Sequence, residues 1–406
     1  MTILAVFLLG VNFTFPDRPV EQMLGQLIRI VFPPTITPED LHERYRDGKI
    51  KILLVPGHDN KNSGAEFRGL KEADLNLEVA KNLFELLTAD KHFEVIAARD
   101  FVSGNYLREL ASYFVSEERA IKAFREESQA VMDALITAEI AQDKSNQNHG
   151  FAKEDVALQL YGLNKWANEN DIDIVIHFHF NDYPRPRRNL PGEYTGFAVY
   201  VPESQYPNAL ASIDFARTIF NQLQKHLPVS NLPFEKQGVI EDQELIAVGA
   251  NASREGVSLL IEYGYIYEGR FVNAEVREAV LKELAFLTYE GIKKYFENEN
   301  YEGELAPTTS LLPYRFGNVL RKEMRGSRDV LHLQAALKSQ GLYPPPGKDL
   351  RECPLNGNFG PCVEAAVKIF QEKYQGEILE PFFLREGTGV VGPATLKKLN
   401  GLYGGE

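Results

Sequence analysis

The feature that most constrains the fold is a regular alternation of short apolar segments and amphipathic segments between residues 49 and 297. Strands are predicted at residues 50–55, 93–98, 172–180, 195–201 and 258–261, and helices at 72–89, 158–168, 213–225 and 276–297. The first segment is apolar except for Lys51 and ends at Pro56-Gly57, as a buried parallel strand does. The alternation predicts an α/β fold with a mostly parallel sheet and helices on both faces.

Outside this alternation the chain is predicted to contain an N-terminal segment, an inserted helical region, a linker and a small helical domain. The ranges are 1–46 for the N-terminal segment, 47–297 for the α/β domain with its insertion at 101–150, 298–326 for the linker and 327–402 for the small domain. The linker lacks hydrophobic periodicity. The small domain shows helical spacing at 329–340, 363–374 and 393–399, and its roughly 70 residues are near the lower limit for independent folding.

The N-terminal segment allows two interpretations. Residues 1–11 form an apolar run of the length of an export-signal core, but the first basic residue is Arg18. An export signal or anchor remnant is one alternative, and a buried strand or helix of the folded protein is the other. A helix is expected at 23–32, and Thr37 is the predicted N-cap of another helix that begins at Pro38. No run reaches the ~18–20 apolar residues of a membrane-spanning helix.

The charge balance and the cysteines limit the function classes. The chain has 44 Lys and Arg against 57 Asp and Glu, so its formal net charge is −13. This balance argues against binding a nucleic-acid backbone and against docking on an anionic membrane through charge. Cys353 and Cys362 are the two cysteines, too few for a Cys-only zinc site. They form one disulfide in an oxidising compartment or are two free buried thiols.

Two polar candidates lie at the start of the α/β region. His58 follows the first predicted strand, and ligands of open α/β sheets gather beyond the carboxyl ends of strands. A hydrogen-bonded structural histidine is the alternative. Glu72 begins the next predicted helix, where the helix dipole favours a carboxylate without any metal.

Three further candidates follow two later strands. His177 and His179 are two residues apart, so they point to the same side of a strand. Glu262 follows the apolar residues of the last predicted strand, and burial there would raise the pKa of its carboxyl group toward that of a general base near neutral pH. Alone, each is also consistent with a structural role. Together, two His and one Glu with water in the fourth position make a standard catalytic zinc site, and a second Glu can take a proton from the water.

These residues occur in stretches that resemble the zinc-dependent N-acetylmuramoyl-L-alanine amidases of bacterial cell-wall turnover, the amidase 3 group, over residues 50–297. The stretches, in family order, are Val55-Pro-Gly-His58, Gly69-Leu-Lys-Glu72-Ala-Asp-Leu-Asn-Leu77, Ala98-Arg-Asp100, Ile176-His-Phe-His179-Phe-Asn181 and Leu260-Ile-Glu262-Tyr-Gly264-Tyr. The resemblance implies that His58, Glu72 and His179 hold Zn²⁺ and that Glu262 is catalytic.

The chain also departs from the family pattern. His177 stands where the family usually has a small residue, so it is expected to support a ligand or to contact substrate. His179 is preferred as the ligand because Asn181 completes a His-x-Asn motif with it, and Asn181 is a further candidate for substrate contact. The insertion at 101–150 has no family counterpart. By analogy with related amidases, it is expected to cover the zinc cleft until an activator protein moves it.

The last unit resembles the peptidoglycan-binding domain 1 repeat, a small three-helix module. The matching stretches are Asp329-Val-Leu-His-Leu-Gln334-Ala-Ala-Leu337, Asn356-Gly-Asn-Phe-Gly360-Pro, Val363-Glu-Ala-Ala-Val-Lys-Ile-Phe-Gln371 and Gly389-Val-Val-Gly-Pro-Ala-Thr-Leu396. A dimerisation domain is the alternative.

The two resemblances imply an extracytoplasmic enzyme that hydrolyses the amide between N-acetylmuramic acid and L-alanine of the peptidoglycan stem peptide. The expected partner is peptidoglycan, with no nucleic acid and no membrane contact beyond an N-terminal anchor. A non-catalytic wall-binding scaffold or regulator and a zinc peptidase acting on stem peptides are the alternatives.

Overall fold

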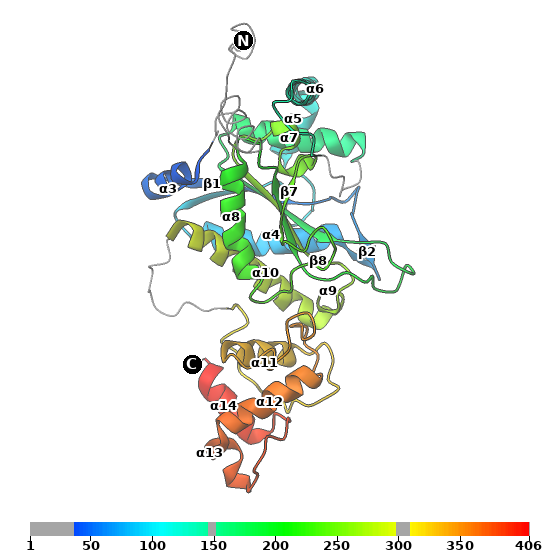
Figure 1. Cartoon of the computed structure of the whole chain (residues 1–406). Coiled ribbons are helices and arrows are strands. Elements are labelled where there is room, and N and C mark those ends of the chain that lie inside the picture. The colour runs from blue at the N-terminus through cyan, green and yellow to red at the C-terminus, as the bar shows by residue number, and fades with distance from the viewer. Residues whose placement is uncertain (1–35, 145–151, 298–308, 406) are drawn as a thin grey trace, which may run out of the picture.

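The computed structural model describes residues 36–144, 152–297 and 309–405, in which a larger sheet-containing part stands above a smaller helical part (Figure 1). The strands of the main sheet are β1 Ile50–Pro56, β4 Phe93–Ala97, β5 Ile174–Asn181, β6 Ala198–Pro202, β7 Val239–Asp242 and β8 Val257–Tyr265. A short antiparallel hairpin, β2 Glu66–Phe67 and β3 Leu70–Lys71, follows β1 in the chain.

The six strands are ordered β4-β1-β5-β8-β6-β7. Every neighbouring pair is parallel except β6 and β8. The predicted α/β fold with a mostly parallel sheet is therefore confirmed. Three strands of this sheet differ clearly from prediction: β6 begins at Ala198 and not at residue 195, β8 continues through Glu262 to Tyr265, and β7 was not predicted because four residues carry too little periodicity. The short strands β2 and β3 were not predicted either.

Helices cover both faces of the sheet, as predicted. The elements are α3 Pro38–Asp47, α4 Glu72–Thr88, α5 Arg108–Ser116, α6 Glu118–Thr137, α7 Glu154–Glu169, α8 Ala209–Leu223, α9 Gly269–Val272 and α10 Ala274–Glu297, with 3-10 turns η1 Ile246–Val248 and η2 Ala250–Ala252. Ile52 and Leu54 of β1 belong to the core with α4, α8 and α10, whereas Leu53 and Val55 pack with α7. This alternation follows from the two-residue period of a strand.

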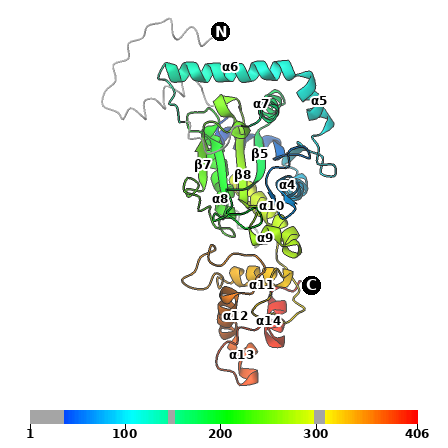
Figure 2. The same cartoon turned by 90° about the vertical axis from the view of Figure 1, so that its right-hand side faces the viewer.

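The insertion at 101–150 contains α5 and α6, and α6 is a long helix that crosses the end of the domain beyond α7 (Figure 2). Thr37 is the N-cap of α3, as predicted, and Thr37 and Asp40 form a reciprocal capping box. The predicted helix at 23–32 and residues 145–150 of the predicted insertion lie outside the described residues.

The C-terminal part contains α11 Arg328–Ser339, α12 Pro361–Lys373, α13 Gln375–Ile378, the turn η3 Glu380–Phe382 and α14 Pro393–Tyr403. Cys353 and Cys362 form a disulfide, so of the two alternatives the structure shows the bonded one. The described end of the expected linker, from residue 309 onward, packs against the domain: Thr309 donates to Glu283 of α10 over 2.7 Å. The helices of this part share one continuous hydrophobic core with the sheet domain.

Candidate metal centre

Three of the predicted side chains meet at the carboxyl edge of the sheet. His58 lies two residues beyond β1, His179 lies near the end of β5, and Glu72 is the first residue of α4. Because β1 and β5 are parallel neighbours, their carboxyl ends lie side by side. The chain topology thus gathers residues that are up to 121 positions apart, from His58 to His179.

The Glu72 carboxylate lies between the two imidazoles. Its Oε2 atom is 3.1 Å from Nε2 of His58, and its Oε1 atom is 2.9 Å from Nδ1 of His179. One ligand atom from each residue lies within 4.8 Å of the others. The carboxylate also accepts from the backbone N–H groups of Ala65 and Phe180, over 2.9 and 3.3 Å. Its contacts are therefore with the site, and none of them caps α4.

The electrostatics favour an ionised ligand at Glu72. Burial opposes ionisation, but hydrogen bonds from His179 and His58 and their charges outweigh it, and the pKa of Glu72 is lowered. A metal ligand must be deprotonated, so a carboxylate held in its charged form suits a cation.

Two glycines clear the space that the imidazoles occupy. A Cβ on Gly57 would collide with the ring of His179, and a Cβ on Gly64 would collide with Glu72 and His58. Gly64 also has a φ of +69°, in the left-handed region that favours glycine. His58 itself has a φ of +62°, which is uncommon for a residue with a side chain and typical of functional sites.

The donor set fits a zinc ion. Zinc takes imidazole nitrogens and carboxylate oxygens at about 2.0–2.2 Å, so tetrahedral ligands lie about 3.3 Å from one another. The distances from Oε2 of Glu72 to His58 and from Oε1 of Glu72 to His179, 3.1 and 2.9 Å, are near that value, and one ligand atom from each of the three residues lies within 4.8 Å of the others. The space cleared by Gly57 and Gly64 and the ionised carboxylate of Glu72 are also what a bound zinc ion requires.

The loop that carries His58 is held by two buried side chains. Nδ2 of Asn76 and Nη1 of Arg99 both donate to the carbonyl oxygen of Gly57, over 3.0 and 3.2 Å. Both residues belong to stretches on which the family resemblance rests. Their positions explain why those stretches accompany the ligands: they fix the peptide that precedes His58.

Glu262 lies beside this cluster on β8, where it pairs in register with His179. Its side chain is buried, and its Oε2 atom has no hydrogen-bond partner among the described residues. Burial, followed by the nearby charges of Glu72 and Glu235, raises the pKa of Glu262 well above its usual value. The direction is the one predicted from the apolar strand.

A pocket of about 560 Å³ opens over the four residues. Its wall also includes His177, Asn181, Asp182 and, from the region of the insertion, Tyr106. His177 and His179 thus line the same pocket, as their spacing predicted. Burial, with the charges of His179 and Arg254, lowers the pKa of His177 to about 3.

Two acidic residues near this pocket were not predicted from the sequence. Glu235 is buried and accepts from Asn181 Nδ2 over 2.9 Å and from Tyr200 over 2.7 Å. Asp182 lines the pocket with an Oδ1 atom that has no partner among the described residues. Asp182 directly follows the His-x-Asn stretch, and this position could have drawn attention to it. Glu235 stands in a loop without a local signal.

The helices of the insertion do not line the pocket in the described part of the chain. The pocket wall on that side comes from α7, through Val156, Gln159 and Leu160. The helix α6 packs on the outside of α7. The α6 helix also contacts η2, which contacts η1, and Ala247 of η1 lines the pocket, so α6 is connected with the pocket through α7 and through these two turns.

The fold and this site define an α/β protein with a candidate three-residue metal centre and an adjacent buried acid. Residues 52–309 match the family model described as N-acetylmuramoyl-L-alanine amidase. This match spans more than half of the chain, and the chain belongs to that family. A comparison with curated proteins found no match.

Solved structures of several amidases are similar to this chain. An N-acetylmuramoyl-L-alanine amidase from Clostridium difficile 630 is 16% identical with a TM-score of 0.37, over 62% of this chain and 98% of that one. AmiC2 of Nostoc punctiforme is 18% identical with a TM-score of 0.37, over 62% and 98%. The CwlD amidase from Clostridioides difficile, solved in complex with the GerS lipoprotein, is 16% identical with a TM-score of 0.40, over 61% and 99%.

The helices were also compared with the requirements of a bilayer span. Within the described ranges, none of them combines the necessary length with sufficient apolar character.

Proposed function

We propose that this peptidoglycan amidase uses a zinc ion held by His58, Glu72 and His179 to hydrolyse the bond between N-acetylmuramic acid and L-alanine of the stem peptide. The observation that carries the proposal is the meeting of this cluster with the buried carboxyl group of Glu262 in one pocket. When bound, zinc supplies Lewis acidity, which polarises a carbonyl group and acidifies a water molecule.

Glu262 is proposed to be the catalytic acid and base. Its carboxylate would take a proton from the attacking water and then donate it to the nitrogen of the departing L-alanine. Its Oε2 atom, which has no hydrogen-bond partner in the part of the chain that the structure describes, is available for this transfer. Burial raises the pKa of Glu262, and the charge of a nearby cation would lower it again toward the working range.

His177 and Asn181 are proposed to contact substrate. Both line the pocket, but they are held differently. The buried His177 is neutral because its pKa is lowered, so it offers a hydrogen bond without a charge. Asn181 donates to Glu235, which fixes the orientation of its amide. We propose His179, and not His177, as the zinc ligand, because the Nδ1 atom of His179 lies 2.9 Å from Oε1 of Glu72.

Residues 327–402 are proposed to be a peptidoglycan-binding domain. The described helices of this part are consistent with the three-helix resemblance, and a second attachment to the polymer would raise the local concentration of substrate. The proposal places the protein outside the cytoplasm, where a disulfide such as Cys353–Cys362 persists.

An activator protein acting on the insertion at 101–150 is also proposed. The complex of the CwlD amidase with the GerS lipoprotein shows one amidase with a protein partner. In this chain a partner that moves α6 would loosen α7, whose residues form one wall of the pocket. Deleting 101–150 should raise the turnover of peptidoglycan, and unchanged or lost turnover would contradict this role.

A digest of purified peptidoglycan, combined with the zinc content of the protein, tests the main proposal. An amidase releases intact stem peptides from the glycan, whereas a peptidase shortens the peptides and a scaffold releases nothing. The expected result is one zinc per chain and intact stem peptides. Shortened peptides, or full turnover after zinc is removed, would contradict the proposal.

A further inference from the structure

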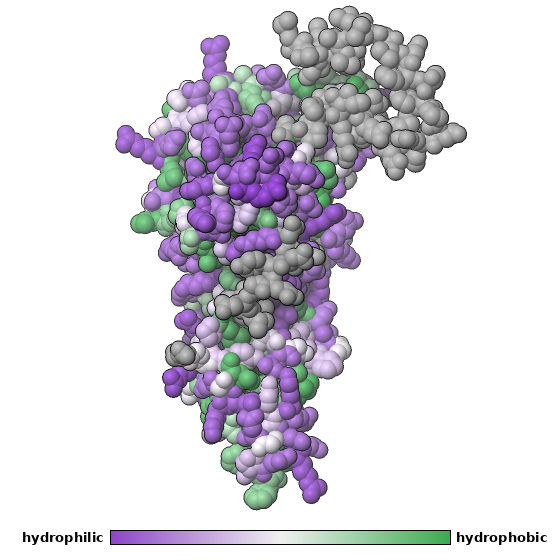
Figure 3. Space-filling model, turned by 90° about the vertical axis from the view of Figure 1, so that its left-hand side faces the viewer, coloured by the Kyte–Doolittle hydropathy of each residue, from purple (hydrophilic) through white to green (hydrophobic). Residues whose placement is uncertain are grey.

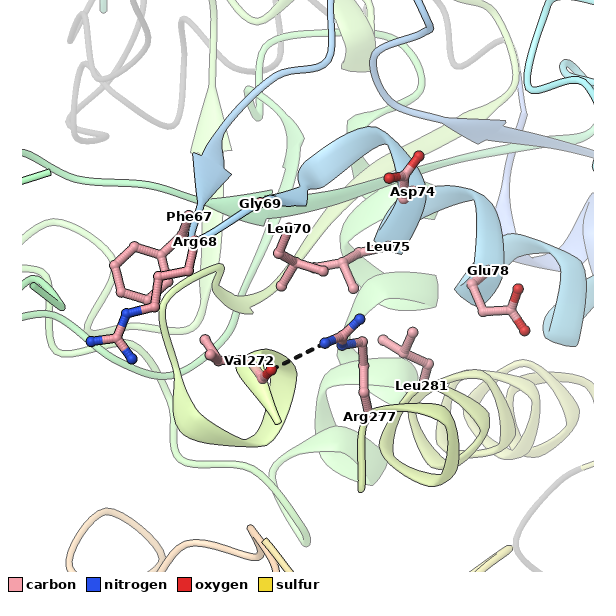
Figure 4. Close-up of a pocket in the computed structure, with 10 residues that line it drawn as sticks. All are labelled: Phe67, Arg68, Gly69, Leu70, Asp74, Leu75, Glu78, Val272, Arg277 and Leu281. Carbon is pink, nitrogen blue, oxygen red and sulfur yellow. Dashed lines mark hydrogen bonds between the residues drawn. The ribbon is translucent and has the colours of Figure 1, made fainter. Parts of the chain in front are cut away.

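A second binding site is suggested by two cavities that flank the β2–β3 hairpin. One, of about 340 Å³, lies between the hairpin, α4 and α10, with Asp74 and Glu78 at one end and Phe67 and Arg68 at the other (Figure 4). The other is about 440 Å³ and shares Phe67, Arg68 and Val272 with the first. Neither cavity contains a residue of the pocket at the candidate metal centre.

The larger cavity is built from both parts of the molecule. The sheet domain contributes the hairpin, Tyr267 and α9, and the C-terminal part contributes Pro354 and Asn356. The disulfide from Cys353 to Cys362 closes the loop that carries these two residues, and Arg351 anchors it by donating to the carbonyl oxygen of Val229 over 2.7 Å. The disulfide and this hydrogen bond therefore fix the position of the loop that forms this side of the cavity.

The chemistry of the cavity favours an anion. Arg270 lines it, is 2% exposed, and donates from Nη2 to Oε2 of Glu268 over 2.6 Å. The Nε and Nη1 atoms of Arg270 are buried and have no partner among the described residues. Oε1 of Glu268 accepts from the backbone N–H groups of Gly196 and Tyr265, so this carboxylate is already engaged. The buried guanidinium thus has one acceptor, Glu268, and lies 4.9 Å from the ring centroid of Phe271, while two of its nitrogens lack an acceptor among the described residues. A carboxylate is the acceptor that suits these two nitrogens best.

The rim adds a second cation and an open space. Arg68 is exposed at the rim, and its guanidinium lies 5.0 Å from the ring centroid of Phe67. Its Nε and Nη2 atoms donate to the carbonyl oxygen of Asn189 over 3.3 and 3.0 Å, so Nη1 is the nitrogen left for a ligand. The cavity wall carries two arginines and one glutamate, so it is positive within a chain of net charge −13. A Cβ on Gly269 would meet no atom within 4 Å, which leaves room for a ligand beside α9.

We propose that this junction cavity binds the carboxylate end of a peptidoglycan stem peptide, as a site separate from the metal centre. The inference rests on the proposed function, since it takes the ligand from the polymer that the amidase cleaves. Arg270 and Arg68 recognise the carboxylate, and Phe67 and Tyr267 contact the apolar part of the peptide. A polymer bound here and in the metal pocket is held at two points.

Calorimetric titration of the full chain with a synthetic stem peptide tests the site. The peptide with free carboxylates should bind at least about tenfold more tightly than the same peptide with amidated carboxylates. Gly269→Phe fills the cavity and should lower the affinity by a similar factor. Gly317→Phe is the matched control, because Gly317 also faces open space but does not line the cavity, and its affinity should be unchanged.

Equal affinity for the two peptides, or unchanged affinity in Gly269→Phe, would contradict the proposal that the cavity binds a carboxylate. If Gly269→Phe fails to fold by its melting curve, Arg68→Gln takes its place and should weaken binding of the free-carboxylate peptide alone. Amidase turnover measured on the same samples separates the two proposals. Carboxylate-dependent binding without turnover leaves the cavity in place and rejects the proposed function. If the protein turns over peptidoglycan but Gly269→Phe leaves peptide affinity unchanged, the proposed function stands and the cavity site is rejected.

Discussion

Two buried glutamates of this protein pair with histidines, in surroundings that differ. Glu283 of α10 lies 2.8 Å from Nδ1 of His226 and accepts from the hydroxyl groups of Thr309 and Ser310. Ser310 also donates its backbone N–H over 2.7 Å. Both carboxylate oxygens are thus engaged by groups of the chain itself, and the cluster fastens the segment at 309–310 to α10.

Glu72 has two histidines, and the cluster borders a pocket of about 560 Å³. The imidazole of His58 is 26% exposed, against 9% for His226. Glycines at positions 57 and 64 keep the space around the rings clear. The comparison shows that a buried Glu–His pair is not by itself a sign of metal binding. A second histidine, access and cleared space distinguish the candidate metal centre from a structural ion pair.

The largest effect on zinc affinity and turnover is expected from Glu72→Gln. This change removes one anionic ligand, and we expect zinc affinity to fall by more than about 100-fold, since even the partners of ligands contribute 10–100-fold. Amidase turnover should fall to background. The zinc content after dialysis is the measurement, and Glu283→Gln is the matched control that should retain its zinc. Equal zinc loss in both variants would contradict the distinction between the candidate metal centre at Glu72 and the structural pair of Glu283 with His226.

Glu262→Gln should separate metal binding from catalysis. Removal of the proposed catalytic acid and base is expected to lower turnover about 10²–10⁴-fold, while the zinc content stays at the level of the unchanged protein. Turnover is measured by release of stem peptides. Sedimentation with peptidoglycan should be unaffected. Retained turnover would remove Glu262 from its proposed role.

Glu283→Gln should affect folding and leave the reaction intact. It leaves His226 with a neutral partner in a buried place, and breaking such a pair costs about 3–5 kcal/mol of unfolding free energy. Denaturant unfolding measures the loss. At a temperature well below the melting point, turnover per folded chain should match that of the unchanged protein. A large loss of turnover without a loss of stability would place this cluster in the reaction.

The smallest effect is expected in the acid dependence of stability. Burial opposes ionisation of Glu283, but His226 and the hydroxyl donors hold its pKa below the usual value of about 4.3. The unfolded chain therefore binds this proton first as the pH falls. The stabilisation from Glu283 is complete above the usual pKa and is lost as the pH falls through the lower, folded value. Melting curves from pH 6 to pH 3 should fall less steeply for Glu283→Gln, and parallel curves would contradict this assignment.

Much of the site was predictable because its residues follow strong local patterns. His58 and His179 lie at the ends of apolar strands, and Glu72 lies where an amphipathic helix begins. In contrast, the predicted end of the last strand at residue 261 was too early. Glu262 remains in β8 because β5 and β6 pair with it on both sides, and that pairing is not encoded locally.

The sequence by itself determined the α/β alternation, the cap at Thr37 and the residue types of the candidate metal centre, because periodicity and short-range chemistry depend on neighbouring residues. Only the tertiary structure decided that Glu235 holds Asn181, that Glu283 fastens residues 309–310, and that Arg270 faces a junction with the C-terminal part. Each of these contacts joins segments that are distant in the chain. The stabilisation from these contacts comes from burial and from pairing between different elements, which cannot be predicted from a local sequence pattern.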